Sequence, residues 1–164
     1  MTRRKLISFT LGAAGIPFTL RAIDVHPPAG KFKAKTLDGE TFDNQSVAGK
    51  VVLIQFWATW CQYCRSDESS VEAMVREFGP KGLIVLAVDV GESKKKVRQY
   101  LEKSPRSCKI VLTEDTNLAA WYAAKTYPYY VLIDREGKLA GEHKGAGGET
   151  SLRRLLHKAG LDSE

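Results

Sequence analysis

A Cys-x-x-Cys pair between a strand and a helix constrains this chain more than any other feature. Residues 51–56 are apolar and rich in β-branched side chains, apart from Gln55, and this pattern predicts a buried strand. After Cys64 the apolar residues recur with a helical period, at Val71, Met74, Val75 and Phe78. Cys61 and Cys64 therefore lie where the strand ends and the helix begins, which is typical of thiol-disulfide redox sites.

The position of the pair assigns a role to each cysteine. A helix N-terminus carries unpaired N–H groups and the positive end of the helix dipole, and both stabilise a thiolate at Cys61. Cys64 lies one turn further along and should be the less exposed sulfur. We predict that Cys61 is the attacking nucleophile and that Cys64 is the resolving thiol.

The first 22 residues differ from the rest of the chain. Three basic residues near the start precede a mostly apolar stretch of 15 residues, 6–20, which is shorter than the roughly 20 residues that span a membrane. We expect an export signal or a membrane tether over 1–22, a Pro- and Gly-containing linker over 23–31 and one domain over 32–164. Twin-arginine and general secretory export both remain open, and both place the domain outside the cytoplasm, where disulfides persist.

The charge of the chain does not indicate a nucleic-acid partner. The sequence holds 25 basic and 19 acidic residues, and four of the basic ones fall in the first 22 residues, which hold no acid. The remaining chain is close to neutral. We therefore set nucleic acid aside, and we expect contact with a membrane only through the N-terminal segment.

Strands and helices alternate along the domain. A hairpin is predicted over 32–42, single strands over 51–56, 83–88 and 109–112, and a second hairpin over 129–143. Helical periodicity falls between the single strands, before the second hairpin and at the C-terminus. This order predicts an α/β fold with a mixed sheet, parallel at its centre, and helices on both faces.

Several motifs together resemble one known family. They are Phe56-Trp57-Ala58-Thr59-Trp60-Cys61, Val88-Asp89-Val90-Gly91-Glu92-Ser93, Tyr127-Pro128 before a strand, and Val131-Leu132-Ile133-Asp134. The chain is similar to the exported TlpA/ResA-type thiol-disulfide oxidoreductases of the thioredoxin-fold superfamily, over most of residues 30–160. The resemblance implies a thioredoxin-like fold with an N-terminal β-hairpin extension.

The resemblance also implies how substrate binds. In such proteins the proline before the last hairpin is cis and packs against the disulfide, and Pro128 matches it. The backbone of the preceding residue, Tyr127, would then pair with an extended substrate segment beside the sulfurs. The residues expected to contact substrate are Trp60, Gln62, Tyr63, Tyr127 and Pro128.

Proton handling departs from the thioredoxin pattern. Thioredoxins carry a buried acid six residues before the first cysteine, where this chain has Gln55, which cannot titrate. The ResA-like pattern places an acid three residues after the second cysteine, and Asp67 matches it, with Glu68 as a fallback. Ser69 replaces a kinking proline of the family, so a straighter helix is expected.

Other functions of the cysteines are less favoured. Zinc binding would need a second cysteine pair or paired histidines, and haem attachment would need a histidine where Arg65 stands. A peroxidase would need a threonine that Cys61 lacks. A copper-binding module is the serious non-enzyme alternative, although the three histidines are far from the cysteines in sequence. Cys108 is expected to be a buried small side chain, with a regulatory thiol as the alternative.

We therefore predict an exported protein thiol-disulfide oxidoreductase with Cys61, Cys64 and Asp67 as catalytic residues. It needs no metal and no cofactor beyond its own Cys61–Cys64 disulfide. Its expected partners are a disulfide-containing extracytoplasmic protein and a membrane electron donor, and the family resemblance gives apocytochrome c as one substrate. Disulfide oxidase or isomerase activity is the alternative within the same chemistry.

Overall fold

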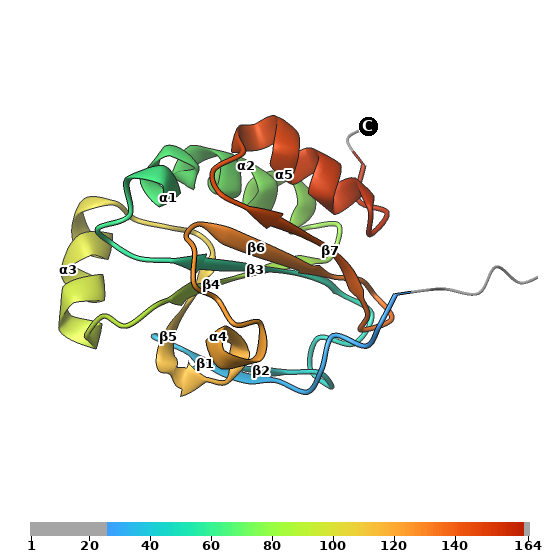
Figure 1. Ribbon diagram of the computed structural model, residues 1–164, viewed down its shortest axis with the longest axis horizontal. Helices are drawn as coiled ribbons and strands as arrows, with labels where there is room; N and C mark the ends of the chain where they lie inside the picture. Colours follow the sequence, from blue (N-terminus) through green and yellow to red (C-terminus); the bar gives the residue numbers. More distant parts are fainter. Residues whose placement is uncertain (1–25, 163–164) are drawn as a thin grey trace, which may run out of the picture.

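A computed structural model describes residues 26–162, which form a seven-stranded sheet with helices packed on it (Figure 1). The strands are β1 (Lys33–Thr36), β2 (Thr41–Asp43), β3 (Val51–Trp57), β4 (Leu83–Asp89), β5 (Lys109–Thr116), β6 (Tyr129–Ile133) and β7 (Leu139–Lys144). The helices are α1 (Gln62–Ser66), α2 (Glu68–Phe78), α3 (Lys94–Lys103), α4 (Leu118–Trp121) and α5 (Gly148–His157). This is the order of elements that the sequence predicts.

The strand order in the sheet is β2-β1-β5-β4-β3-β6-β7. The three strands β3, β4 and β5 run parallel, and every other neighbouring pair is antiparallel. The predicted mixed sheet with a parallel centre is therefore confirmed. β3 lies between β4 and β6, so the cysteines follow the carboxyl end of an internal strand. Open α/β sheets place their ligands at the carboxyl ends of such strands.

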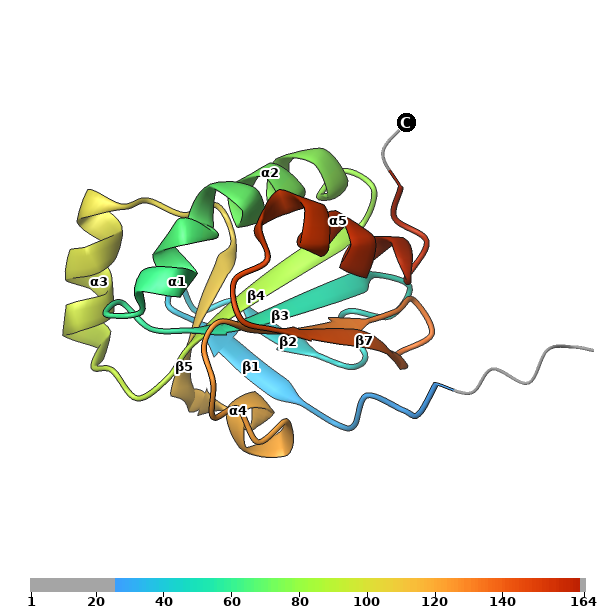
Figure 2. The ribbon, with the colours of Figure 1, turned by 45° about the horizontal axis from the view of Figure 1, so that its top comes forward.

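Alternation along β3 divides the core in two. Leu53 and Trp57 belong to one cluster together with the buried faces of α2, α3 and α5. Ile54 and Phe56 belong to the second, which includes Leu118 of α4 and residues of the N-terminal hairpin. Figures 1 and 2 show α2 and α5 side by side over one face of the sheet, with α4 against the other. Gln55 lies two residues from both Leu53 and Trp57 along β3, so its side chain is on the same face of the sheet as α2.

The helix after the cysteines is divided at Asp67, whereas the sequence favoured a straighter helix. Asp67 is both the C-cap of α1 and the N-cap of α2. Its N–H donates a hydrogen bond to Cys64 O at 3.2 Å. That bond closes a turn one residue shorter than an α-helical turn. The division lies two residues before Ser69, and it turns the Asp67 side chain into the protein, where 2% of the residue is exposed.

The predicted targeting segment, 1–22, lies outside the described residues. Residues 27–29, within the predicted linker, contact the hairpin of β6 and β7: Ala29 N donates to Gly137 O, and Leu139 N donates to Pro27 O. Within residues 26–162, no helix has both the length and the apolar character needed to cross a membrane.

Replacing Leu53 with Ala tests the central position of β3. Leu53 is a fully buried residue of β3 in the core cluster that includes residues of α2. Truncating its side chain should lower the free energy of unfolding by about 2–5 kcal/mol. Urea titration measures the change. Lys35→Ala, an exposed position of β1, should change it by less than about 0.5 kcal/mol, and equal effects at the two sites would contradict this fold.

Candidate active site

Cys61 and Cys64 form a disulfide with their Cα atoms 5.2 Å apart. Cys61 is the N-cap of α1, and its Sγ accepts a hydrogen bond from Cys64 N at 3.1 Å. Cys61 is 5% exposed and Cys64 is 1% exposed, so Cys64 is the less accessible sulfur, as expected. Both sulfurs therefore sit in the protein core, and only Cys61 reaches its edge.

An aromatic surface surrounds this edge. Trp60 and Tyr63 are 60% and 70% exposed, and Gln62 between them is exposed as well. Tyr127 meets the Trp60 ring edge-on, with the ring centres 6.2 Å apart. The Tyr127–Pro128 bond is cis, which confirms the expectation from the resemblance. The roles of these residues in substrate binding stay predictions.

The loop before Cys61 is held by Glu92, which lies between β4 and α3. The Glu92 carboxylate accepts hydrogen bonds from Thr59 N at 2.6 Å and from Thr59 Oγ1 at 2.7 Å. Lys96 pairs with the same carboxylate at 2.5 Å. Glu92 was not among the predicted site residues, although it lies in a motif on which the resemblance rests.

Asp89 and Glu92 form an unequal acid pair. Asp89 is fully buried at the end of β4, and its Oδ1 accepts from Glu92 N at 3.2 Å. Burial, together with the neighbouring Glu92 carboxylate, raises the pKa of Asp89 to about 7. Bonds from Lys96 and Thr59 outweigh the burial of Glu92 and lower its pKa to about 2. Asp89 therefore titrates near neutral pH, whereas Glu92 remains the charged partner of Thr59.

Asp67 is bound by three donors from distant parts of the chain. Its Oδ2 accepts from Tyr130 Oη at 3.0 Å and from Gly147 N at 3.1 Å, and its Oδ1 accepts from Gly148 N at 3.0 Å. In all three hydrogen bonds the Asp67 carboxylate is the acceptor. The fallback acid, Glu68, instead accepts from the hydroxyls of Tyr100 and Ser104 on the side of α3.

Two further polar residues lie on the cysteine face and were not singled out from the sequence. Tyr130 accepts from Gln55 Nε2 at 3.1 Å, and Arg106 Nη2 donates to Gln55 Oε1 at 2.7 Å. Burial and the neighbouring Asp67 raise the pKa of Tyr130 above its usual range. No local motif marks Arg106, because it reaches Gln55 across 51 positions of sequence.

Cys108 is the third cysteine, and it is buried without a disulfide partner. Burial raises the pKa of the Cys108 thiol to about 11, so the thiol is protonated at neutral pH. Among residues 26–162, no three His, Cys, Asp or Glu side chains converge as metal ligands.

Comparison with known proteins supports a thiol-disulfide redox site at Cys61 and Cys64. The model of the AhpC/TSA family matches residues 25–141. The chain belongs to the AhpC/TSA family.

The chain is also similar to proteins named as thioredoxin-like and as thiol-disulfide oxidoreductases. Thioredoxin-like protein YneN of Bacillus subtilis is 33% identical over 131 residues, which cover 78% of this chain and 76% of YneN. Thiol-disulfide oxidoreductase ResA of the same organism is 29% identical, covering 79% of this chain and 72% of ResA.

The solved structures give the same result. A Chlorobium tepidum protein described as thiol:disulfide interchange protein DsbE superposes with a TM-score of 0.73 at 25% identity, covering 82% of this chain and 96% of that one. The thioredoxin-like fold and the predicted resemblance are therefore confirmed. This AhpC/TSA member is a thiol-disulfide oxidoreductase of the ResA/DsbE type, with Cys61 and Cys64 as its Cys-x-x-Cys pair.

The acid pair predicts a pH dependence of stability. Between about pH 4, the usual value for Asp, and about pH 7, native Asp89 keeps a proton that the unfolded chain has lost. The free energy of unfolding of the wild type should therefore fall as pH rises through this window, by at most about 1.4 kcal/mol per pH unit from this residue. Asp89→Asn should remove that slope, as measured by urea titration at several pH values.

Two features isolate the effect of Asp89. The opposite contribution of Glu92, whose native pKa is lowered, is lost only as pH falls below about 4.5. Asp115→Asn makes the same chemical change at an exposed position of β5 and should keep the wild-type slope. Identical slopes in the wild type and Asp89→Asn would show that Asp89 is not protonated in the native state.

Proposed function

We propose that this oxidoreductase reduces disulfide bonds in proteins outside the cytoplasm, with Cys61 as the nucleophile. The observation that carries the proposal is the unequal burial of the two sulfurs beside an exposed aromatic surface. In this proposal a protein disulfide reacts with Cys61, the more exposed of the two cysteines, and Cys64 reacts only with the Cys61 sulfur. Attack and resolution are thereby assigned to different sulfurs.

The cycle transfers two electrons in two displacements. The reduced Cys61 thiolate attacks one sulfur of the substrate disulfide, whose S–S bond breaks and releases a substrate thiolate. Cys64 then loses its proton and attacks the Cys61 sulfur, and the second substrate thiolate leaves. The product is the Cys61–Cys64 disulfide, which a membrane electron donor would reduce again.

Asp67 is the proposed acceptor of the Cys64 proton. It lies one helical turn after Cys64, it is buried, and its N–H is bonded to Cys64 O. Its three donors fix the orientation of the carboxylate, and a general base must be positioned in this way. Glu68 is a poorer choice because Tyr100 and Ser104 direct its carboxylate toward α3.

The surface and the N-terminal segment bear on the partners. Trp60, Tyr63 and Tyr127 offer broad aromatic contact area, which suits a partner segment presented in extended form next to Pro128. Residues 1–22 have the composition of an export signal or tether. We include the disulfide of an apocytochrome c among the proposed extracytoplasmic substrates, and its reduction would release the two apocytochrome thiols.

The reduction potential of the Cys61–Cys64 couple tests the direction of electron flow. Titration against dithiothreitol should give a value near the thioredoxin figure of about −270 mV, as a reductant requires. A value near about −120 mV would identify a disulfide oxidant and contradict the proposed direction. Cys108→Ser is the control, and it should leave the potential unchanged because Cys108 has no disulfide partner.

Replacing Asp67 with Asn tests the proton acceptor. Without the Asp67 carboxylate, Cys64 must lose its proton to water before it attacks the mixed disulfide at Cys61. The pH midpoint of the resolution rate should therefore move up by about one unit or more. Stopped-flow measurement across the pH range gives the midpoint. Glu68→Gln should keep the wild-type midpoint, and an unchanged profile in Asp67→Asn would contradict the assigned role.

A further inference from the structure

A chain of hydrogen bonds crosses the core on the cysteine face with every donor pointing the same way. Arg106 donates to Gln55 at 2.7 Å, Gln55 donates to Tyr130 at 3.1 Å, and Tyr130 donates to Asp67 at 3.0 Å. The direction is fixed at both ends, because a guanidinium only donates and a carboxylate only accepts. We call these four residues the relay.

Arg106 is the unusual member of the relay. Its side chain is 1% exposed, and its guanidinium carbon lies 4.9 Å from the centre of the Trp57 ring. The nearest carboxylate is that of Glu72, 4.0 Å from Nε, and it already accepts bonds from Ser107 N and Oγ. Within the described chain, Nε and Nη1 have no hydrogen-bond partner. Arg106 is therefore a buried cation whose best-aligned connection leads through the relay to Asp67.

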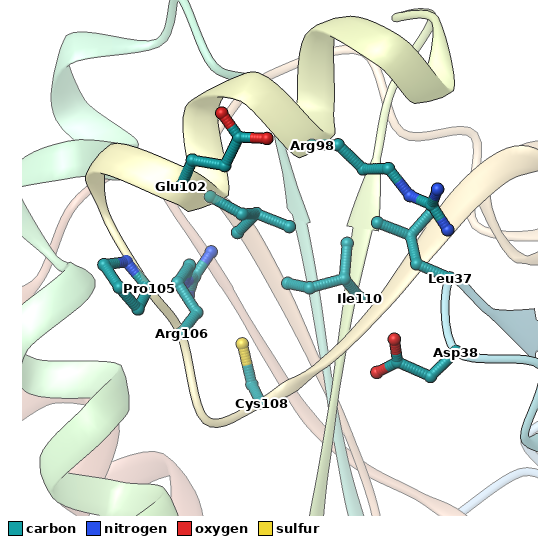
Figure 3. Close-up of a pocket in the computed structure, with 9 residues that line it drawn as sticks. Leu37, Asp38, Arg98, Glu102, Pro105, Arg106, Cys108 and Ile110 are labelled. Carbon is teal, nitrogen blue, oxygen red and sulfur yellow. The ribbon is translucent and has the colours of Figure 1, made fainter.

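Arg106 lies next to a cavity on the side of α3. Figure 3 shows Arg106 and Cys108 in the wall of a cavity of about 520 Å³ beneath α3, with Arg98 on its far side. This cavity is lined by α3 and β5 and by the turn after β1, and the redox pair is not part of its lining. Arg106 therefore lies between this cavity and the core that contains Gln55.

Other titratable groups also face the relay. Cys64 and Glu68 flank Asp67 on the helices, His143 of β7 packs its ring 6.2 Å from that of Tyr130, and Glu72, Tyr100 and Cys108 surround Arg106. Glu72 and Glu68 are engaged by Ser107, Tyr100 and Ser104. Arg106 is the only one of the residues named here that is both buried and permanently cationic.

We propose that Arg106 is a positioning residue whose buried charge acts through Gln55 and Tyr130 on Asp67. The relay holds the orientation of the Asp67 carboxylate, which takes the Cys64 proton. When Cys64 attacks the mixed disulfide, its thiol proton passes to that carboxylate, the new S–S bond forms to Cys61, and the substrate sulfur leaves with the electron pair of the broken bond. Gln55 cannot titrate, so the relay conveys orientation and polarisation and moves no proton. The inference rests on the proposed role of Asp67.

The test follows the resolving step directly. The reduced protein, in a Cys108→Ala background, reacts with dithiobis(nitrobenzoate). This aromatic disulfide releases one coloured thiolate when Cys61 attacks and a second when Cys64 resolves. Arg106→Gln should move the pH midpoint of the second release upward by about 0.5–1 unit, a three- to tenfold change in proton affinity. In an Asp67→Asn background the same substitution should produce no further shift.

Matched variants separate charge from structure. Arg106→Lys keeps the buried cation and should restore much of the midpoint. Arg98→Gln removes an exposed arginine from the same cavity and should leave the midpoint at the wild-type value. Gln55→Leu cuts the relay without removing the cation and should shift the midpoint upward, which keeps the test valid if Arg106→Gln fails to fold.

The outcomes distinguish this inference from the proposed function. Unshifted midpoints in both Arg106→Gln and Gln55→Leu would overturn the relay and leave the role of Asp67 intact. An Arg106→Gln shift that persists in the Asp67→Asn background would show that the arginine acts on sulfur directly, and would also overturn it. A wild-type profile in Asp67→Asn alone would instead remove Asp67 from the proposed function, and the relay would fall with it.

Discussion

Satisfying polar groups inside the core is the constraint on which this structure depends. Gln55, Asp67 and Tyr130 are buried on the face of the sheet that carries the disulfide, and each would cost about 1–3 kcal/mol without a partner. Their bonds to one another, and from Gly147 and Gly148 to Asp67, meet that cost. The hydrogen bonds from Gly147 N and Gly148 N connect the start of α5 to the junction of α1 and α2. The acid beside the redox pair therefore also fixes the last helix of the fold.

The two buried acids near the cysteines differ because their surroundings differ. Asp67 faces three N–H and O–H donors, and its carboxylate accepts a hydrogen bond from each. Asp89 faces the Glu92 carboxylate in a fully buried position, which favours the protonated form. The two aspartates therefore have different surroundings on the two sides of the active-site loop: Asp67 has hydrogen-bond donors around it, and Asp89 has a second carboxylate.

The sequence predicted the fold because its signals are local. The apolar run of β3, the 3.6-residue period through Val71 and Phe78, and the Cys-x-x-Cys pair each lie within a few residues. Glu92 and Arg106 could not be assigned in this way. Their contacts with Thr59 and Gln55 span 33 and 51 positions and depend on the order in which β3, β4 and β5 pair. The division of the helix at Asp67 likewise follows from partners in β6 and α5 rather than from Ser69.

Burial also separates chemistry from recognition in this protein. The proposed proton path and the relay lie in the core, where charges are screened little by salt and where a docking partner cannot displace them. The aromatic surface around Trp60 lies outside the core, and it is the surface proposed to contact substrate. Cys61, at the boundary, is the one group that belongs to both regions. If the proposed roles hold, the residues that govern reactivity lie in the core and those that govern recognition lie on the surface, so substitutions can change one without the other.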